Sequence, residues 1–74
     1  MVYIFNISLY YGTEVCAVKA FDIVDAKAIV RIAHRDNDFD NDDIRLVATT
    51  PSLVTPDGHE IGLLDCITLG YYQE

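Results

Sequence analysis

The strongest constraint on the fold is a run of alternating side chains at the start of the chain. In residues 2–11, aromatic and β-branched side chains recur at every second position, a period that is typical of a β-strand. Gly12-Thr13 interrupts the alternation, and residues 14–20 resume it. A glycine that opens a short connection between two such runs predicts a hairpin, because glycine adopts positive φ without a Cβ clash. We expect two antiparallel strands joined by a tight turn at Gly12-Thr13.

The alternation also predicts which side chains share a face of the sheet. One face takes Tyr3, Phe5, Ile7, Leu9 and Tyr11, and the other takes Val2, Ile4, Asn6, Ser8 and Tyr10. Adjacent strand residues point to opposite faces. In each of the pairs Tyr10-Tyr11 and Tyr71-Tyr72, we therefore expect one tyrosine to be buried and the other exposed.

Residues 22–35 show the clearest helical pattern. Apolar side chains recur at three- and four-residue spacing, and the stripe that we expect to face the sheet is Ile23, Ala26, Ile29, Val30 and Ala33. Asp22 is placed to cap the first turn, and Asp25 follows three residues later in a spacing like that of a capping box. Acidic residues begin the segment and basic residues end it, which complements the helix dipole.

The third strand is predicted at residues 44–50, where Ile44, Leu46 and Ala48 fall on one side. Pro51 ends it, because proline cannot donate a hydrogen bond to a strand ladder.

Residues 56–58, Pro-Asp-Gly, predict a type I turn followed by a left-handed glycine. A short strand at residues 53–54 could pair across this turn, and the apolar residues 61–69 predict the fourth strand. The predicted fold is a single α+β domain of residues 1–74. It is a four-stranded antiparallel sheet in β-β-α-β-β order with one helix packed on one face.

Composition indicates a small domain with a real core. Of the 74 residues, 51% are hydrophobic, well above the level of a disordered chain. A core of this size supports only a few kcal/mol of net stability, so a homodimer or a partner could contribute. The chain lacks a signal-peptide pattern and an apolar run of the roughly 18 residues that a membrane span needs. We expect a cytoplasmic protein that does not associate with membranes.

The net charge of the chain indicates which kind of molecule it can bind. Twelve acidic residues against five basic ones give a net charge of −7. Such a charge repels nucleic acid and anionic membranes and steers the protein toward basic surfaces. We expect no direct nucleic-acid binding.

No catalytic pattern stands out. Cys16 and Cys66 lie in separate apolar stretches, which is typical of small buried side chains. His34 fits a helix-end cation and His59 a turn residue. Nothing in the sequence brings a thiol and a base together. We expect no enzymatic activity, no cofactor and no metal.

The most unusual stretch is RDNDFDNDD, residues 35–43, which holds five aspartates and one phenylalanine. One interpretation is a solvated helix-to-strand connection, since Asp and Asn favour turns. The other is a binding surface, because five neighbouring carboxylates repel one another and a solvated turn does not need them. Charge that steers a partner and an aromatic side chain that anchors it are typical of binding hot spots. The predicted partner-binding residues are Asp36, Asp38, Phe39, Asp40, Asp42 and Asp43.

A weak calcium-binding module is the third interpretation. An EF-hand loop that starts at Asp36 would place aspartates at its first, third, fifth and seventh positions. Its twelfth position, which needs a bidentate glutamate, is Val47. We expect calcium to bind weakly if at all.

Residues 18–39, VKAFDIVDAKAIVRIAHRDNDF, followed by IRLV, resemble the strand, Ala-Lys-containing helix and strand of some small phage-encoded anti-CRISPR proteins. The resemblance implies stoichiometric inhibition of a host CRISPR surveillance complex at a basic surface that normally holds DNA, with the aspartates as a phosphate mimic. Such a protein would act in the host cytoplasm. The alternative is a general small interaction or oligomerisation domain with a solvated acidic loop.

Overall fold

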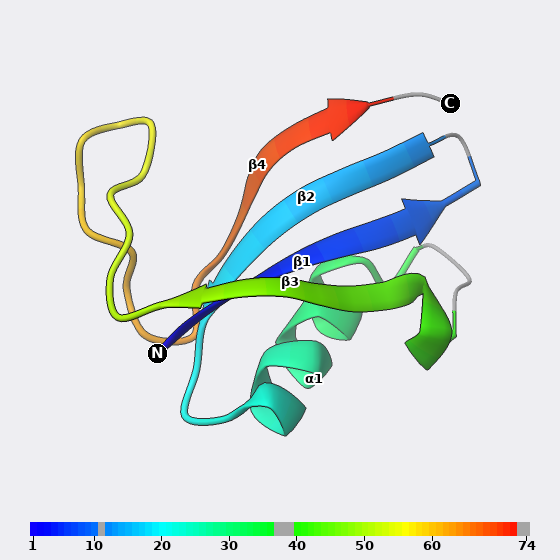
Figure 1. Cartoon of the computed structure of the whole chain (residues 1–74), viewed down its shortest axis with the longest axis horizontal. Helices are drawn as coiled ribbons and strands as arrows, with labels where there is room; N and C mark the ends of the chain where they lie inside the picture. Colours follow the sequence, from blue (N-terminus) through cyan, green and yellow to red (C-terminus); the bar gives the residue numbers. More distant parts are fainter. Residues whose placement is uncertain (11, 37–39, 73–74) are drawn as a thin grey trace.

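The computed structural model describes residues 1–10, 12–36 and 40–72, which form an α+β domain (Figure 1). The described residues form a four-stranded antiparallel sheet and one α-helix, as the sequence predicts. A short 3-10 helix, η1, precedes the third strand and has no counterpart in the sequence prediction. The elements are β1 Val2–Leu9, β2 Gly12–Lys19, α1 Ile23–Ala33, η1 Asn41–Asp43, β3 Ile44–Thr50 and β4 Cys66–Tyr72.

The β1–β2 hairpin occupies the centre of the sheet. The strand order is β3-β1-β2-β4, so β3 and β4 are the two edges (Figure 1). Within the hairpin, Phe5 pairs with Cys16 and Leu9 pairs with Gly12. The chain therefore reverses before Gly12, and the predicted turn at Gly12-Thr13 is wrong because both residues belong to the ladder. Gly12 has a φ of 150°, which glycine adopts readily because it has no Cβ. The glycine is therefore needed at the first residue of β2 rather than in the turn.

A bulge in β3 overturns the predicted face of that strand. The register between β3 and β1 shifts once, and Val47 is the residue left without a partner. An extra residue moves the side chains that follow it to the other face of the sheet. Leu46 therefore lies opposite Phe5 on the helix side, whereas Ala48 lies on the other side. Ile44, Leu46 and Ala48 do not share a face, and of these three only Ile44 is buried.

The helix begins as the sequence predicts. Oδ1 of Asp22 accepts a hydrogen bond from the backbone N–H of Asp25 at 2.8 Å, which makes Asp22 the N-cap. The helix ends at Ala33, with His34 as the C-cap. Within the described residues, no helix has the length and hydropathy needed to cross a bilayer.

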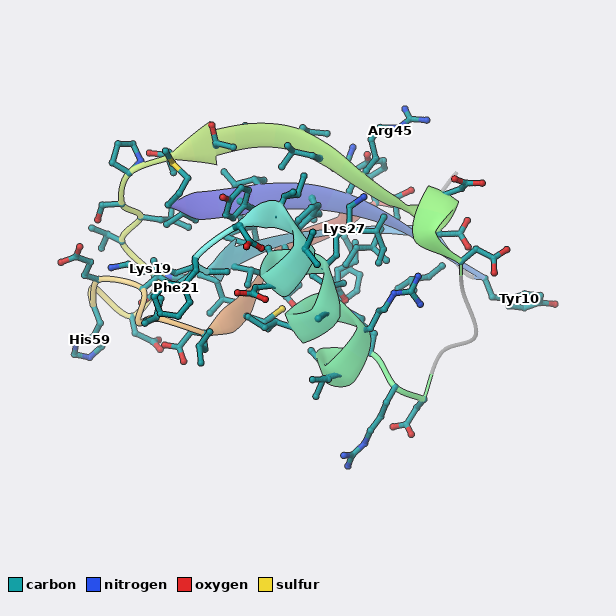
Figure 2. All side chains as sticks on the ribbon, turned by 90° about the horizontal axis from the view of Figure 1, so that it is seen from below. Tyr10, Lys19, Phe21, Lys27, Arg45 and His59 are labelled. Atoms are coloured by element: carbon teal, nitrogen blue, oxygen red, sulfur yellow. The ribbon has the colours of Figure 1, made fainter. Side chains whose placement is uncertain are left out.

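The predicted apolar stripe of α1 is confirmed at its centre and wrong at its ends. Ala26 and Val30 are buried against the sheet, and Ile29 packs at the margin of the same core. Ile23 and Ala33 are exposed. The helix packs against β2 and β4 and runs obliquely across the strands (Figure 2). An oblique crossing brings the middle of the predicted stripe, rather than both of its ends, onto the sheet.

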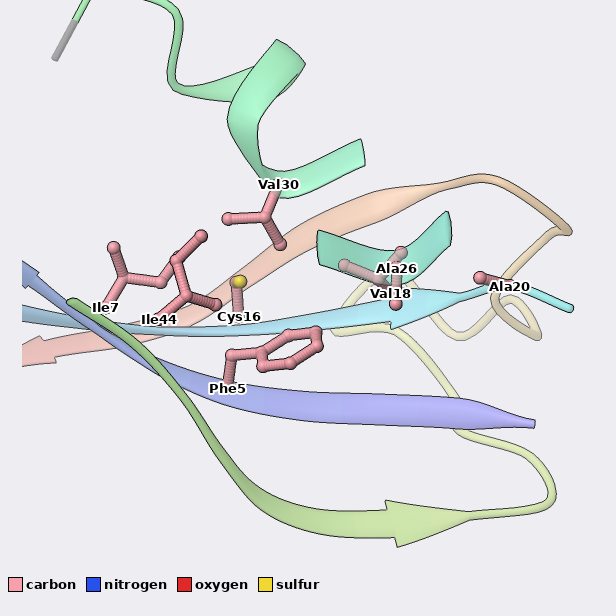
Figure 3. Close-up of a cluster of buried hydrophobic side chains, with 8 residues drawn as sticks. All are labelled: Phe5, Ile7, Cys16, Val18, Ala20, Ala26, Val30 and Ile44. Atoms are coloured by element: carbon pink, nitrogen blue, oxygen red, sulfur yellow. The ribbon is translucent and has the colours of Figure 1, made fainter. Parts of the chain in front are cut away.

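The main core lies between α1 and the sheet, where side chains from both strands of the hairpin meet the helix (Figure 3). Its fully or nearly fully buried members are Phe5, Ile7, Cys16, Val18, Ala20, Ala26, Val30 and Ile44. A smaller cluster covers the opposite face of the sheet and consists of Val2, Ala17 and Ile61, with Ile4, Leu53 and Ile67 packed around it. Both faces of the hairpin thus contribute to folding, but the helix face contributes more.

The fourth strand is Cys66–Tyr72 rather than residues 61–69. Ile61 instead packs against Val2 on the face opposite the helix. Leu64 has a φ of 68°, a conformation that no strand residue adopts, so the chain turns here before β4 begins. The predicted turn at residues 56–58 is confirmed, since Gly58 has a φ of 88° and its N–H donates to the carbonyl of Thr55. The short strand expected at residues 53–54 is present as a single bridge from Val54 to Glu60.

Tyr71 and Tyr72 are exposed at 63% and 49%, so the expectation that one of them is buried is wrong. They end an edge strand, at the part of the sheet that the second apolar cluster does not reach. Tyr10 is fully exposed, and its neighbour Tyr11 lies outside the described residues.

Two isoleucine truncations test this arrangement. Ile7 is fully buried and Ile32 is largely exposed on the helix. Replacing Ile7 with alanine should lower the free energy of unfolding by about 2–5 kcal/mol, because it leaves a cavity in the main core. Ile32→Ala should change it by no more than about 0.5 kcal/mol. Urea denaturation of both variants measures the difference, and equal losses would contradict the position of the helix.

Candidate functional site

The acidic segment, residues 36–43, connects the end of α1 to the start of β3. Two of its six predicted contact residues, Asp38 and Phe39, lie outside the described residues. Among the described residues of the segment, the exposed carboxylates are those of Asp36, Asp40 and Asp42. Three of the predicted contact residues therefore face solvent, and whether they contact a partner stays a prediction.

Asp43 has a structural role that the sequence reasoning did not separate from the rest. It is half-buried at the end of η1. Its Oδ2 accepts a hydrogen bond from the N–H of Asp40 at 2.8 Å, and its own N–H donates to the carbonyl of Asp40 at 3.0 Å. This pair of bonds closes the turn into β3, so turn chemistry accounts for the carboxylate of Asp43.

An exposed aromatic side chain lies at the same end of the sheet as the acidic segment. Tyr10 follows β1, and η1 packs against β1. Figure 2 shows the Tyr10 ring pointing into solvent on the side of the molecule where η1 lies. The sequence signal for it was the tyrosine pair before Gly12, of which one member was expected to be exposed.

A polar hollow lies beside the acidic segment on the sheet face opposite the helix. Its volume is about 190 Å³, and its lining residues are Asn6, Ser8, Thr13, Asp42, Arg45 and Tyr72. The pairing of Asn6 with Arg45, of Ser8 with Thr13 and of Thr13 with Tyr72 brings these side chains together from four strands. The sequence reasoning missed this group, because each member is an ordinary polar strand residue until the register is known.

A buried charged pair ties the end of the helix to β2. Nε2 of His34 lies 2.5 Å from Oε2 of Glu14, and Nδ1 of His34 lies 2.9 Å from the carbonyl oxygen of Val30. The side chains are 11% and 4% exposed for His34 and Glu14. A doubly protonated ring donates to both acceptors at once. The sequence placed His34 correctly at the end of the helix but did not identify Glu14 as its partner.

The surroundings shift the proton affinity of this histidine. Burial disfavours the charged ring, but the hydrogen bonds to Val30 and Glu14 and the negative charge of Glu14 outweigh it and raise the pKa of His34 above 6.5. Cys66 acts in the same direction as Glu14.

The two cysteines meet across the β2–β4 ladder. Val18 pairs with Cys66 and Cys16 pairs with Thr68, so the thiols are diagonal neighbours on the helix face. The thiol of Cys16 donates a hydrogen bond to Cys66, which together with burial raises the pKa of Cys16. The same bond lowers the pKa of Cys66, against the effect of burial. Cys16 is a buried core residue, as predicted, whereas Cys66 is only half-buried.

The group formed by Glu14, His34, Cys16 and Cys66 is best suited to holding the helix in place. A histidine that activates a thiol needs a ring nitrogen directed at the sulfur, but the two ring nitrogens of His34 bond to Val30 and Glu14. Removing one member of a buried charged pair leaves the other without compensation. We therefore assign Glu14 and His34 a structural role. In the described part of the chain, no three His, Cys, Asp or Glu side chains are grouped so as to hold a metal ion.

Comparison of the chain with protein-family models, with curated proteins and with solved structures gives no match.

The Glu14–His34 pair predicts a dependence of stability on pH. A raised folded-state pKa of His34 means that its contribution is fully present below the unfolded value of 6.5 and is lost as the pH rises through the folded value. Urea midpoints between pH 5 and 8 should therefore fall more steeply with pH in the parent than in His34→Gln. Making both measurements in a Cys66→Ser background removes any contribution of that thiol, whose pKa is lowered by its hydrogen bond with Cys16. Parallel curves would contradict the pairing.

Calcium should have little effect on the protein. The twelve residues of an EF-hand loop that begins at Asp36 would run through η1 and into β3, and the last of them is Val47. Calcium at millimolar concentration should therefore raise the melting temperature no more than magnesium does. A rise with calcium alone, measured by thermal denaturation, would show that the aspartates form a cation site.

Proposed function

We propose that the protein is a small acidic inhibitor of anti-CRISPR type. It binds stoichiometrically to a basic, nucleic-acid-binding surface of a host CRISPR surveillance complex, in the cytoplasm of the host of a phage. It acts by occupying that surface, without catalysis and without touching nucleic acid directly.

The observation that carries the proposal is the exposure of three carboxylates at one end of the sheet. Asp36, Asp40 and Asp42 face solvent, and Tyr10 projects from the same end. Carboxylates of this kind attract lysine and arginine side chains and raise the rate of association. An exposed tyrosine adds contact area at a low cost in conformational entropy.

A solvated loop explains fewer of the aspartates in the acidic segment than a binding surface does. Turn chemistry accounts for Asp43, which closes the turn before β3. It does not require the exposed carboxylates of Asp36, Asp40 and Asp42, which increase repulsion within a chain of net charge −7. Natural proteins retain such unfavourable surface charge where it serves binding.

The resemblance to anti-CRISPR proteins supplies the class of target. It covers residues 18–39 and the start of β3, which are the elements that flank and include the acidic segment. A basic channel that normally holds DNA is a chemically complementary surface for clustered carboxylates.

Replacing the three exposed aspartates with asparagine tests the proposal. Asp36→Asn, Asp40→Asn and Asp42→Asn together remove three charges, keep the side-chain shape and leave the Asp43 turn intact. The parent protein, at equimolar concentration, should prevent purified type I surveillance complexes from shifting a target duplex in a gel. The triple variant should lose at least tenfold in potency, and rising salt should weaken the parent.

A matched control removes three charges elsewhere. Asp25→Asn, Asp57→Asn and Glu60→Gln change residues that are exposed and distant from the acidic segment in the chain. This control should inhibit as the parent does. Equal inhibition by the aspartate variant would place the contact surface elsewhere, and a parent that inhibits none of the complexes would refute the function.

A further inference from the structure

The outer edge of β4 has none of the charge that commonly protects a sheet edge. Cys66–Tyr72, CITLGYY, contains no charged residue and no proline, and among the described residues β2 is the one strand that pairs with it. The opposite edge, β3, carries Arg45 and is followed directly by Pro51. Each edge strand contains one bulge, so the bulges do not distinguish them. An unprotected edge is a template for another strand.

Exposed apolar side chains follow the same edge. We define the β4 edge surface as Leu64, Leu69, Tyr71 and Tyr72, all of which are more than 40% exposed. Leu64 lies in the turn before the strand, where its N–H donates to the carbonyl of Lys19 at the end of β2. Tyrosines bury about 150–250 Å² each at interfaces. Together with the unpaired strand backbone, the surface offers a large part of the roughly 800 Å² that each partner buries in a stable complex.

From these features we infer that a second copy of this chain pairs along β4, antiparallel and related by two-fold symmetry, so that the two sheets become one. The inference does not depend on the partner of the acidic segment.

Charge favours a second copy as the occupant. A protein of net charge −7 resists self-association wherever its acids meet. The strand order places the acidic segment next to β3 and leaves β4 at the opposite edge (Figure 1). Pairing along β4 therefore keeps the two acidic segments far apart, and in a register centred on the strand, Asp65, the acid that precedes β4, does not lie opposite its own copy.

The bulge at Leu69 places Ile67 and Tyr71 on opposite faces of β4, since Ile67 pairs with Ala17 and Tyr71 pairs with Glu14. Each face of the strand therefore offers an apolar or aromatic side chain to a second copy. A basic partner, by contrast, would be drawn to the acidic segment rather than to this edge.

Charged substitutions on the two edges form a matched test. Thr68→Lys with Leu69→Lys places two lysines on β4, and Val47→Lys with Ala48→Lys places two on β3; all four side chains are exposed. In sedimentation velocity at about 100 μM, the parent and the β3 variant should have twice the chain mass of 8.3 kDa. The β4 variant should have the mass of a single chain while keeping its far-UV circular dichroism.

Hydrogen exchange on the parent provides a measurement that needs no variant. Amide protection in β4 should increase with protein concentration, whereas protection in β3 should not. A parent that sediments as a single chain would overturn the inference, as would a dimer that survives the β4 lysines or dissociates with the β3 lysines. Protection of β4 that appears only when another protein is added would assign the edge to that protein instead.

Discussion

The pairing of β1 with β2 is the contact on which the rest of the molecule depends. Each central strand has the other on one side and an edge strand on its far side, so the hairpin register decides which side chains every other element meets. With Phe5 opposite Cys16, the large apolar residues face α1. A slip of one residue would instead place Asn6 and Ser8 beneath the helix and expose the core. Contacts made by the other elements could not compensate for this change of register.

Local pattern predicted the elements well, and two of the deviations have the same origin. The helix cap at Asp22 and the turn at Gly58 depend on neighbours within a few residues, and both were predicted. The bulge at Val47 and the turn at Leu64 depend on strands and carbonyls far away in the chain. A period of two or of 3.6 carries no information about a partner strand, and this is why the face of β3 and the start of β4 were wrong.

The candidate site shows the same division. The exposure of Asp36, Asp40 and Asp42 follows from composition, because several adjacent carboxylates cannot be buried together. The ion pair between Glu14 and His34 joins residues from different elements, and the polar hollow draws on four strands. Such groups become visible only when the sheet register is known. A buried glutamate on an apolar strand was the one local sign that a cation had to lie nearby.

The long separation between β2 and β4 has a consequence for the order of folding. The hairpin and α1 form from contacts close in sequence, whereas β2 obtains its outer neighbour only after residues 66–72 have been synthesised. Contacts of this kind form late, since a long loop must close first. Until then the outer edge of β2 is unpaired and its apolar side chains lack one neighbour. The nascent chain therefore passes through a stage at which it can associate wrongly, and the speed at which β4 docks limits how long that stage lasts.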